Sequence, residues 1–310
     1  MKVVVIILNW NGKDDTLASL ATVSHPHIIV VDNGSTDGSV AAIRAAYPTV
    51  QLIEAGVNLG YAGGNNVGIE KALEQGADAV LLLNNDTVVD PGFVEAFIAS
   101  ATENPSIGIW GGYPLQFHDP LRLDHLGGVW NPEKGDFDLV GLHQPSGFRA
   151  DQPLDYVCGC SIFIQRAVFD AVGLLEPKFF LFWEEADLAM RAKKAGFGVA
   201  VCYSAHLRHK VSASFIGGSP HKKYFWWRGR LLWIERNCLP QEKRALFRKI
   251  VYPELWHYTK LYWIKRILSP AKKQKLAEYR AIQQAIRDFL RGAFGPGPAW
   301  LFARDARSLV

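Results

Sequence analysis

The chain has 310 residues, of which 49% are hydrophobic and 21% charged, and this composition excludes an intrinsically disordered protein. No apolar run approaches the roughly 18 residues of a membrane-spanning helix, and the first residues predict a strand rather than a signal peptide. The four cysteines are too few and too scattered for a disulfide framework. We therefore expect a soluble protein with reduced thiols and one large domain, or one and a half.

The net charge of +4 conceals an uneven distribution along the chain. Residues 1–207 hold 12 Lys and Arg against 24 Asp and Glu, whereas residues 208–310 hold 22 against 6. Such a basic segment is expected to face an acidic partner, an anionic membrane surface or nucleic acid.

Four short segments rich in β-branched residues predict the strands of a parallel sheet covered on both faces: residues 3–8, 27–31, 50–54 and 79–83. Helical patterns lie between them, at residues 13–22, 39–47 and 65–75. This βαβαβαβ order predicts an open α/β sheet whose ligands bind at the carboxyl ends of the strands.

The remainder of the chain is less regular. Residues 105–153 are rich in Gly, Pro and His and predict irregular loops with a hairpin. Residues 156–173 predict a strand and a short helix, residues 179–196 a helix that ends at a glycine, and residues 197–209 a returning strand. From about residue 221 the chain is predicted to be helical, basic and aromatic.

Each predicted strand of the first part ends in polar residues, in the loops 9–12, 32–39, 58–66 and 84–87. The first of these, "LNWNGKDD", lacks the G-x-G-x-x-G fingerprint of dinucleotide-binding enzymes, and no Walker A sequence occurs. Asp32 could bind a ribose or a base edge, and Asp86 could bind Mg²⁺ or Mn²⁺. Taken alone, each aspartate fits better as a turn-forming residue.

The segment "FWEEADL" places three carboxylates beside aromatic residues. Acidic residues in a first helical turn are favoured by the helix dipole, which is one explanation of the pattern. The other is catalytic, because apolar surroundings raise the pKa of a carboxylate and make it a better base. His209 is the last residue of the next predicted strand and offers a metal ligand, although a lone histidine there is more often a satisfied surface or core residue.

Six segments in this order resemble the glycosyltransferase family 2 enzymes, in particular their rhamnosyltransferase-like bacterial branch. They are "VVIILNWNG", "IIVVDNGSTDGS", "GVNLGYAGGNNVGI", "LLLNNDTVVDPGFV", "FFLFWEEADLAMRAKKAGF" and "HKVSAS", which together span residues 3 to about 214. The resemblance implies a GT-A-type open α/β sheet that binds a dTDP-, UDP- or GDP-linked sugar. It also implies inverting transfer of that sugar, with rhamnose as the first guess, to a glycan or lipid-linked glycan in cell-surface polysaccharide synthesis.

The resemblance also assigns roles to residues. Its donor-binding positions correspond to Asn9, Asn11, Asp32, Asn33, Ser35, Asn58, Gly60, Gly64, Asn65, Asn84 and Asn85. Asp86 and His209 correspond to ligands of Mg²⁺ or Mn²⁺, with Asn84 as an outer partner of the metal motif. Glu185 corresponds to the catalytic base, and Glu184 and Asp187 to acids that orient the acceptor or a neighbouring helix. This chain has E-E where the family has E-D, and that departure leaves a non-catalytic sugar-nucleotide-binding or scaffold protein as the alternative.

The sequence divides into a transferase domain at residues 1–215, with a donor half to about residue 105 and a catalytic half after it, and a helical region at 216–310. Tryptophan and tyrosine beside lysine and arginine in residues 222–275 are typical of helices in a lipid headgroup layer. The alternative is packing on the transferase core or in a homodimer, and nucleic acid is not expected. We expect the protein to be cytoplasmic and to contact the inner face of the cell membrane.

Overall fold

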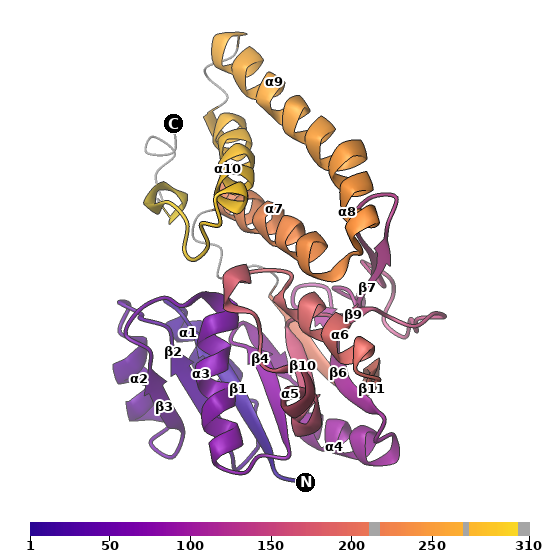
Figure 1. Cartoon of the computed structure of the whole chain (residues 1–310). Helices are drawn as coiled ribbons and strands as arrows, with labels where there is room; N and C mark the ends of the chain where they lie inside the picture. Colours follow the sequence, from indigo (N-terminus) through magenta and orange to yellow (C-terminus); the bar gives the residue numbers. More distant parts are fainter. Residues whose placement is uncertain (211–217, 269–272, 303–310) are drawn as a thin grey trace.

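The computed structural model describes residues 1–210, 218–268 and 273–302. An α/β body carries a group of C-terminal helices on one end (Figure 1). An eight-stranded sheet in the order β3-β2-β1-β4-β10-β6-β11-β5 forms the centre of the body. Its strands are β1 (Val3–Asn9), β2 (Ile28–Asp32), β3 (Gln51–Glu54), β4 (Ala79–Asn84), β5 (Thr87–Val89), β6 (Ile107–Gln116), β10 (Ser161–Gln165) and β11 (Gly198–His209).

The predicted βαβαβαβ unit is present, because β3, β2, β1 and β4 are parallel neighbours. Its helices are α1 (Lys13–Leu20), α2 (Ser39–Ala46) and α3 (Gly60–Glu74), with α4 (Phe93–Glu103) after β5. Beyond β4 the sheet is mixed. Strand β10 runs antiparallel to both β4 and β6, and β5 runs antiparallel to β11.

The sheet is covered on both faces, as the continuous apolar strands predict. Alternate residues of β1 join different clusters: Val4 and Ile6 pack in one, and Val5 and Ile7 in the other. All four are buried. A strand that buries both faces cannot alternate apolar with polar residues, which explains the uninterrupted apolar run.

The prediction of irregular loops across residues 105–153 missed strand β6, which pairs with both β10 and β11. Its sequence, IGIWGGYPLQ, contains residues that weaken a strand prediction. The glycines have a packing reason, since a Cβ on Gly111 would lie 2.5 Å from the Val157 Cβ and one on Gly112 would lie 2.9 Å from the Ser161 hydroxyl. The same region also forms the predicted hairpin, with β7 (Gly127–Asn131) and β8 (Asp136–Val140) in a small sheet that β9 (Tyr156–Val157) completes.

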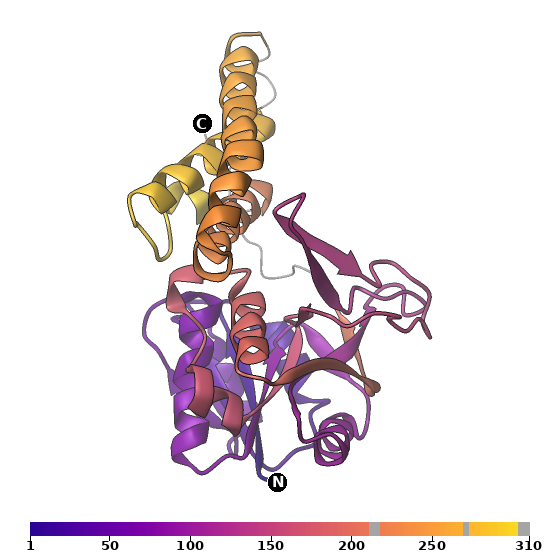
Figure 2. The same cartoon turned by 45° about the vertical axis from the view of Figure 1, so that its right-hand side comes forward.

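The α/β body continues with α5 (Arg166–Val172) and α6 (Glu184–Lys194). The C-terminal part contains α7 (Gly218–Asn237), α8 (Pro240–Leu246), α9 (Tyr252–Leu268) and α10 (Lys273–Leu290). Figure 2 shows the hairpin of β7 and β8 rising from the body toward these helices. Arg230 on α7 donates hydrogen bonds to the carbonyls of Gly135 and Lys134 at the tip of this hairpin, at 2.7 Å each. The proposed domain boundary near residue 215 lies outside the described residues.

Helix α7 is buried on more than one side, as its aromatic residues predict. Tyr224, Phe225 and Leu231 pack against residues of α10, and Trp233 packs in the core of the body. The expectation that residues 222–237 face lipid is therefore wrong for these side chains, and packing on the transferase core holds for α7. Within the described residues, no helix is long and apolar enough to cross a bilayer.

Candidate active site

A cavity of about 410 Å³ opens at the carboxyl ends of β1 and β4, between the body and the start of α7. Its walls include the following sequence-predicted site residues: Asn33, Asn58, Gly60, Asn84, Asn85, Asp86, Glu184, Glu185 and His209. Asp86 comes from the polar loop after β4 and Glu185 from the first turn of α6. The structure therefore brings the predicted metal ligand and the predicted base to one cavity.

Asp86 and His209 are placed together by the pairing of β5 with β11. Thr87 pairs with His209, and the backbone N–H of Lys210 donates to the Asp86 carbonyl at 3.0 Å. The His209 Nε2 lies 3.3 Å from Asp86 Oδ1. Burial alone lowers the pKa of His209, but its bonds to Asp124 and Asp86 outweigh burial and raise the pKa to about 10.

Asp124 is a residue that the sequence did not identify. Its Oδ2 accepts a hydrogen bond from His209 Nδ1 at 2.9 Å, which leaves Nε2 directed at Asp86. A carboxylate that holds the distal nitrogen of a histidine in this way is the usual support of a metal-binding imidazole. One carboxylate oxygen and one imidazole nitrogen fit a Mg²⁺ or Mn²⁺ ion that takes its other ligands from diphosphate and water. Asp86 and His209 are therefore the residues that would hold the ion.

Glu184 and Glu185 follow a segment with unusual backbone geometry. Phe180, Phe182 and Trp183 all have positive φ, at 65°, 68° and 75°. Such conformations cost about 1–3 kcal/mol each in non-glycine residues and occur preferentially at functional sites. The strained turn directs the first turn of α6 at the cavity.

The carboxylates of Glu184 and Glu185 each have an oxygen without a hydrogen-bond partner in the described part of the chain. Among the described residues, the Oε2 atoms of Glu184 and Glu185 are buried without a hydrogen-bond partner. Burial raises the pKa of Glu185 to about 7. Burial, and then the charge of Glu185, raises the pKa of Glu184 well above its ordinary value. A carboxylate with a pKa near neutrality is suited to take a proton from a substrate hydroxyl.

The loops after β1 and β2 form a hydrogen-bonded network outside the cavity walls. Asn9 donates to the Asp32 carboxylate at 2.8 Å and to the Ser35 hydroxyl at 3.1 Å, and the Asn11 N–H donates to Ser35 at 2.9 Å. Asp32 is buried and also accepts from the Ser35 N–H. These four residues lie together, as predicted, but they support the loops, and their contact with a nucleotide stays a prediction.

The segment between β3 and α3 contributes only partly to the cavity. The Asn33 amide donates to Asn58 at 3.0 Å and to the Gly60 carbonyl at 3.1 Å, and all three line the cavity. Gly64 and Asn65 do not. A Cβ on Gly64 would lie 2.5 Å from Leu8, so this glycine allows α3 to approach the sheet, and the Asn65 amide donates to the Tyr61 carbonyl within α3.

Asp187 lies outside the cavity walls and is fully buried. Its carboxylate accepts hydrogen bonds from Arg191 at 2.9 Å, from Arg236 at 2.8 Å and from Asn237 at 3.0 Å. These contacts join α6 to α7, which agrees with the orienting role that the resemblance allowed, and a part of Asp187 in catalysis stays a prediction. Residues 211–214 of the "HKVSAS" segment lie outside the described residues.

The family model of glycosyl transferase family 2 matches residues 4–173. The chain belongs to glycosyl transferase family 2. An N-acetylglucosaminyl-diphospho-decaprenol L-rhamnosyltransferase of Mycobacterium tuberculosis is 28% identical over 274 residues, which cover 74% of this chain and 86% of the relative. Relatives of this family 2 protein are thus glycosyltransferases. The name of the mycobacterial relative contains a lipid-linked acceptor, N-acetylglucosaminyl-diphospho-decaprenol.

Two solved structures share the fold at 14% identity. The mannosyltransferase PcManGT of Pyrobaculum calidifontis, in complex with GDP-Man and Mn²⁺, aligns with a TM-score of 0.56 over 93% of this chain and 87% of its own. S. aureus TarS 1–349 aligns with a TM-score of 0.54 over 94% of this chain and 92% of its own. These likenesses confirm the predicted GT-A-type α/β fold of the family 2 chain.

Proposed function

We propose that the chain is a metal-dependent, inverting glycosyltransferase that moves a sugar from a nucleoside diphosphate to a lipid-linked glycan in cell-surface polysaccharide synthesis. The observation that carries this proposal is that Asp86 and Glu185, which are 99 positions apart in the sequence, line one cavity. That cavity offers a divalent-metal site at one wall and a carboxylate with a pKa of about 7 at another.

The residues on these two walls can carry out the two parts of a sugar transfer. Asp86 and His209 would hold the metal ion, which would supply positive charge against the leaving diphosphate. Glu185 takes the proton of an acceptor hydroxyl as its oxygen bonds to the anomeric carbon of the sugar. The bond from that carbon to the phosphate oxygen breaks on the opposite side, and its electron pair leaves with the nucleoside diphosphate. A single displacement of this kind inverts the anomeric centre without a covalent sugar-enzyme intermediate.

The sugar and acceptor are inferred from the relatives. The mycobacterial relative is named for transfer of L-rhamnose to N-acetylglucosaminyl-diphospho-decaprenol. We therefore propose a rhamnosyl donor such as dTDP-rhamnose and a prenyl-diphosphate-linked sugar as acceptor. The solved neighbours include complexes with GDP-Man and with UDP, so donors with these nucleotides belong in the same comparison.

The test is a transfer assay with dTDP-, UDP- and GDP-linked sugars and an N-acetylglucosaminyl-diphospho-prenol acceptor. We expect one donor to be used, with Mn²⁺ or Mg²⁺ required and activity lost in a chelator. Nuclear magnetic resonance of the product should show the anomeric configuration opposite to that of the donor. Donor binding without transfer to this or any lipid-linked acceptor would favour the non-catalytic alternative.

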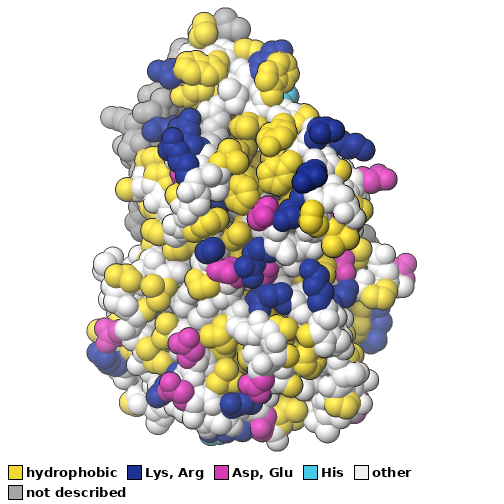
Figure 3. Space-filling model, in the orientation of Figure 1, with side chains coloured by type: hydrophobic (Ala, Val, Ile, Leu, Met, Phe, Trp, Pro, Cys, Tyr) yellow, Lys and Arg dark blue, Asp and Glu magenta, His cyan; other side chains and the backbone are white. Residues whose placement is uncertain are grey.

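Helix α9 is proposed to carry the contact with the membrane. Its residues Tyr252, Trp256, Trp263 and Ile267 recur at helical spacing and are 55%, 65%, 53% and 74% exposed. Lys260 lies over the Trp256 ring at 5.0 Å. Figure 3 shows hydrophobic side chains next to Lys and Arg on the C-terminal part of the molecule. A basic, exposed aromatic stripe fits the headgroup region of an anionic lipid surface at the inner face of the membrane.

Flotation of the full chain with anionic and with neutral vesicles tests this contact. Anionic vesicles should retain the protein at low salt, and Trp256→Ser with Trp263→Ser should weaken binding at least about tenfold, because burial of a large apolar side chain contributes about 1.5–3 kcal/mol. Leu121→Ser is the matched control, since Leu121 is 73% exposed on the body. A dimer in light scattering without flotation would assign the stripe to a homodimer instead.

A further inference from the structure

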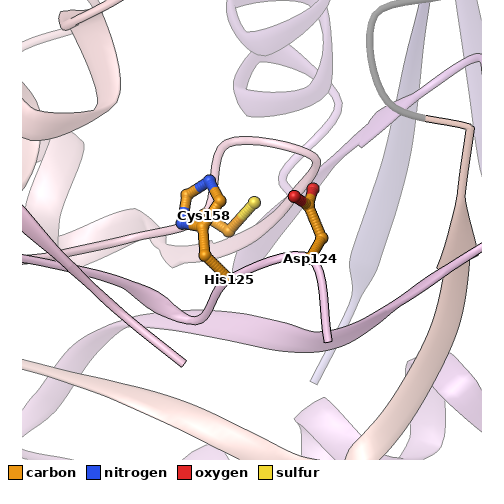
Figure 4. Close-up of side chains that lie close together, drawn as sticks. All are labelled: Asp124, His125 and Cys158. Carbon is orange, nitrogen blue, oxygen red and sulfur yellow. The ribbon is translucent and has the colours of Figure 1, made fainter. Parts of the chain in front are cut away.

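We propose that Asp124, His125 and Cys158 form a second metal site, selective for a soft divalent ion such as Zn²⁺, on the wall of the same cavity. The candidate ligand atoms of these three residues lie within 4.8 Å of one another. Figure 4 shows the three side chains directed into the same region, with the Cys158 sulfur between the imidazole and the carboxylate. This site shares Asp124 with the support of His209, but its ion would bind to other atoms than those of Asp86 and His209, and it does not depend on the transferase proposal.

The backbone holds the three residues in place. Asp124 and His125 lie between β6 and β7, where the Asp124 N–H donates to the Pro114 carbonyl at 2.9 Å. Cys158 follows β9, and its N–H donates to the Leu126 carbonyl at 3.0 Å. The two segments are therefore joined by hydrogen bonds next to the ligands. Ligands that lie directly beside paired strands are held more precisely than ligands in long free loops.

The His125 ring bonds to Cys158 and has a second nitrogen that is left without a partner in the described part of the chain. Among the described residues, the buried Nδ1 of His125 has no hydrogen-bond partner. A buried polar atom without a partner costs about 1–3 kcal/mol, so a native protein usually supplies it with a ligand or an ion. Asp124 uses Oδ2 to hold His209, and its Oδ1 is the oxygen that would meet the ion.

The donor set distinguishes this site from the one at Asp86. Sulfur and imidazole ligands favour Zn²⁺, whereas carboxylate oxygens and water favour Mg²⁺ and Mn²⁺. Three protein ligands leave a fourth tetrahedral position for water or substrate, as in catalytic zinc sites. All three residues line the cavity, so an ion can enter from it and its open position faces the space that Glu185 also lines.

Cobalt(II) tests the proposal, because a cysteine thiolate bound to Co²⁺ gives an intense charge-transfer absorption that oxygen and nitrogen ligands do not give. The full chain is stripped of metal, kept reduced and titrated with Co²⁺ in the absence of donor. We expect one equivalent to produce this absorption, Zn²⁺ to abolish it, and Mg²⁺ or Mn²⁺ to leave it unchanged. His125→Asn should weaken Co²⁺ binding at least about tenfold.

The controls use neighbours of the ligands. Cys158→Ser should remove the absorption, whereas Cys160→Ser should keep it, although the two sulfurs are 3.5 Å apart. Asp86→Asn should also keep it, which separates this result from the outcome of the transferase proposal. No thiolate absorption in the wild-type chain, or an equal absorption in a folded Cys158→Ser variant, would overturn the second site.

Discussion

The raised pKa of Glu185 predicts a steep pH dependence of sugar transfer. With a pKa of about 7, roughly 1% of this carboxyl is ionised at pH 5 and roughly 90% at pH 8. The transfer rate at saturating donor and metal should therefore rise about tenfold per pH unit from pH 5 to 6.5 and level off above pH 8. An ordinary glutamate, largely ionised already at pH 5, would give an almost flat profile over this range.

Single-turnover transfer across pH 5–8 measures the effect, with nucleotide binding followed at each pH to exclude loss of donor. Glu185→Gln should lower the rate by about 10²–10⁴-fold and remove the rise, because general-base catalysis contributes that much. Glu185→Asp is the matched control, since it keeps the carboxylate and should keep the rise at a lower rate. A flat wild-type profile, or an unchanged rise in Glu185→Gln, would refute the assignment.

The same pKa makes a prediction about stability that needs no substrate. In the unfolded chain Glu185 releases its proton near its ordinary pKa, whereas in the folded chain it keeps the proton to about pH 7. The folded state therefore binds more protons between these values, and the free energy of unfolding falls as pH rises through this window. Each pKa unit corresponds to about 1.4 kcal/mol, so the fall is up to about 3 kcal/mol. Urea unfolding at pH 5 and pH 8 should show a smaller fall for Glu185→Gln.

Three further predictions concern residues that support the cavity. Asp187→Asn should lower the free energy of unfolding by about 1.5–3 kcal/mol, measured in urea, because the buried Asp187 carboxylate accepts charged hydrogen bonds from the partly exposed Arg191 and Arg236. Gly60→Ala should cost about 2–4 kcal/mol, since Gly60 has φ of +75° and a Cβ would lie 2.4 Å from the Phe180 carbonyl oxygen. Asp124→Asn should weaken Mn²⁺ binding, measured by calorimetry, about 10–100-fold through the loss of support for His209. Wild-type stability in either of the first two variants, or wild-type Mn²⁺ affinity in the third, would contradict the role assigned.

The parts of the fold that the sequence predicted are those in which local pattern and environment agree. Strands such as β1 are apolar throughout because both of their faces are buried, and the loops after them are polar because they end at the rim of the sheet. Strand β6 was missed because its glycines serve contacts with Val157 and Ser161, which are distant in sequence. Such contacts leave no local signal.

The candidate site also contains residues that the sequence predicted and residues that it did not. Asp86 and Glu185 stand in dense acidic or amide motifs at the ends of predicted elements, so the motifs indicated them. Asp124 and His125 lie in the glycine-rich stretch that was predicted to be irregular, and their relation to His209 and Cys158 depends on strand pairing. The only indication of these two residues in the sequence was an Asp directly followed by a His. Their place in the site can be recognised only when the positions of β6, β9 and β11 are known.

Helices α7 and α9 show why the composition of a helix alone could not tell whether its tryptophans are buried in the protein or face lipid. Both helices combine tryptophan with lysine and arginine, yet Trp233 of α7 is buried whereas Trp263 of α9 is exposed. The difference arises because α7 lies between the body and α10, whereas α9 extends beyond the body (Figure 2).

The most direct test of the account compares Asp86→Asn with Glu185→Gln in nucleotide binding and in transfer. Both residues line one cavity, but we assign them to opposite sides of the reaction. Asp86→Asn should weaken Mn²⁺-dependent binding of the nucleoside diphosphate at least about tenfold, since it removes a metal ligand. Glu185→Gln should bind the nucleotide as the wild-type chain does and yet transfer sugar about 10²–10⁴-fold more slowly. Wild-type nucleotide affinity in Asp86→Asn, or wild-type transfer by Glu185→Gln, would contradict the account.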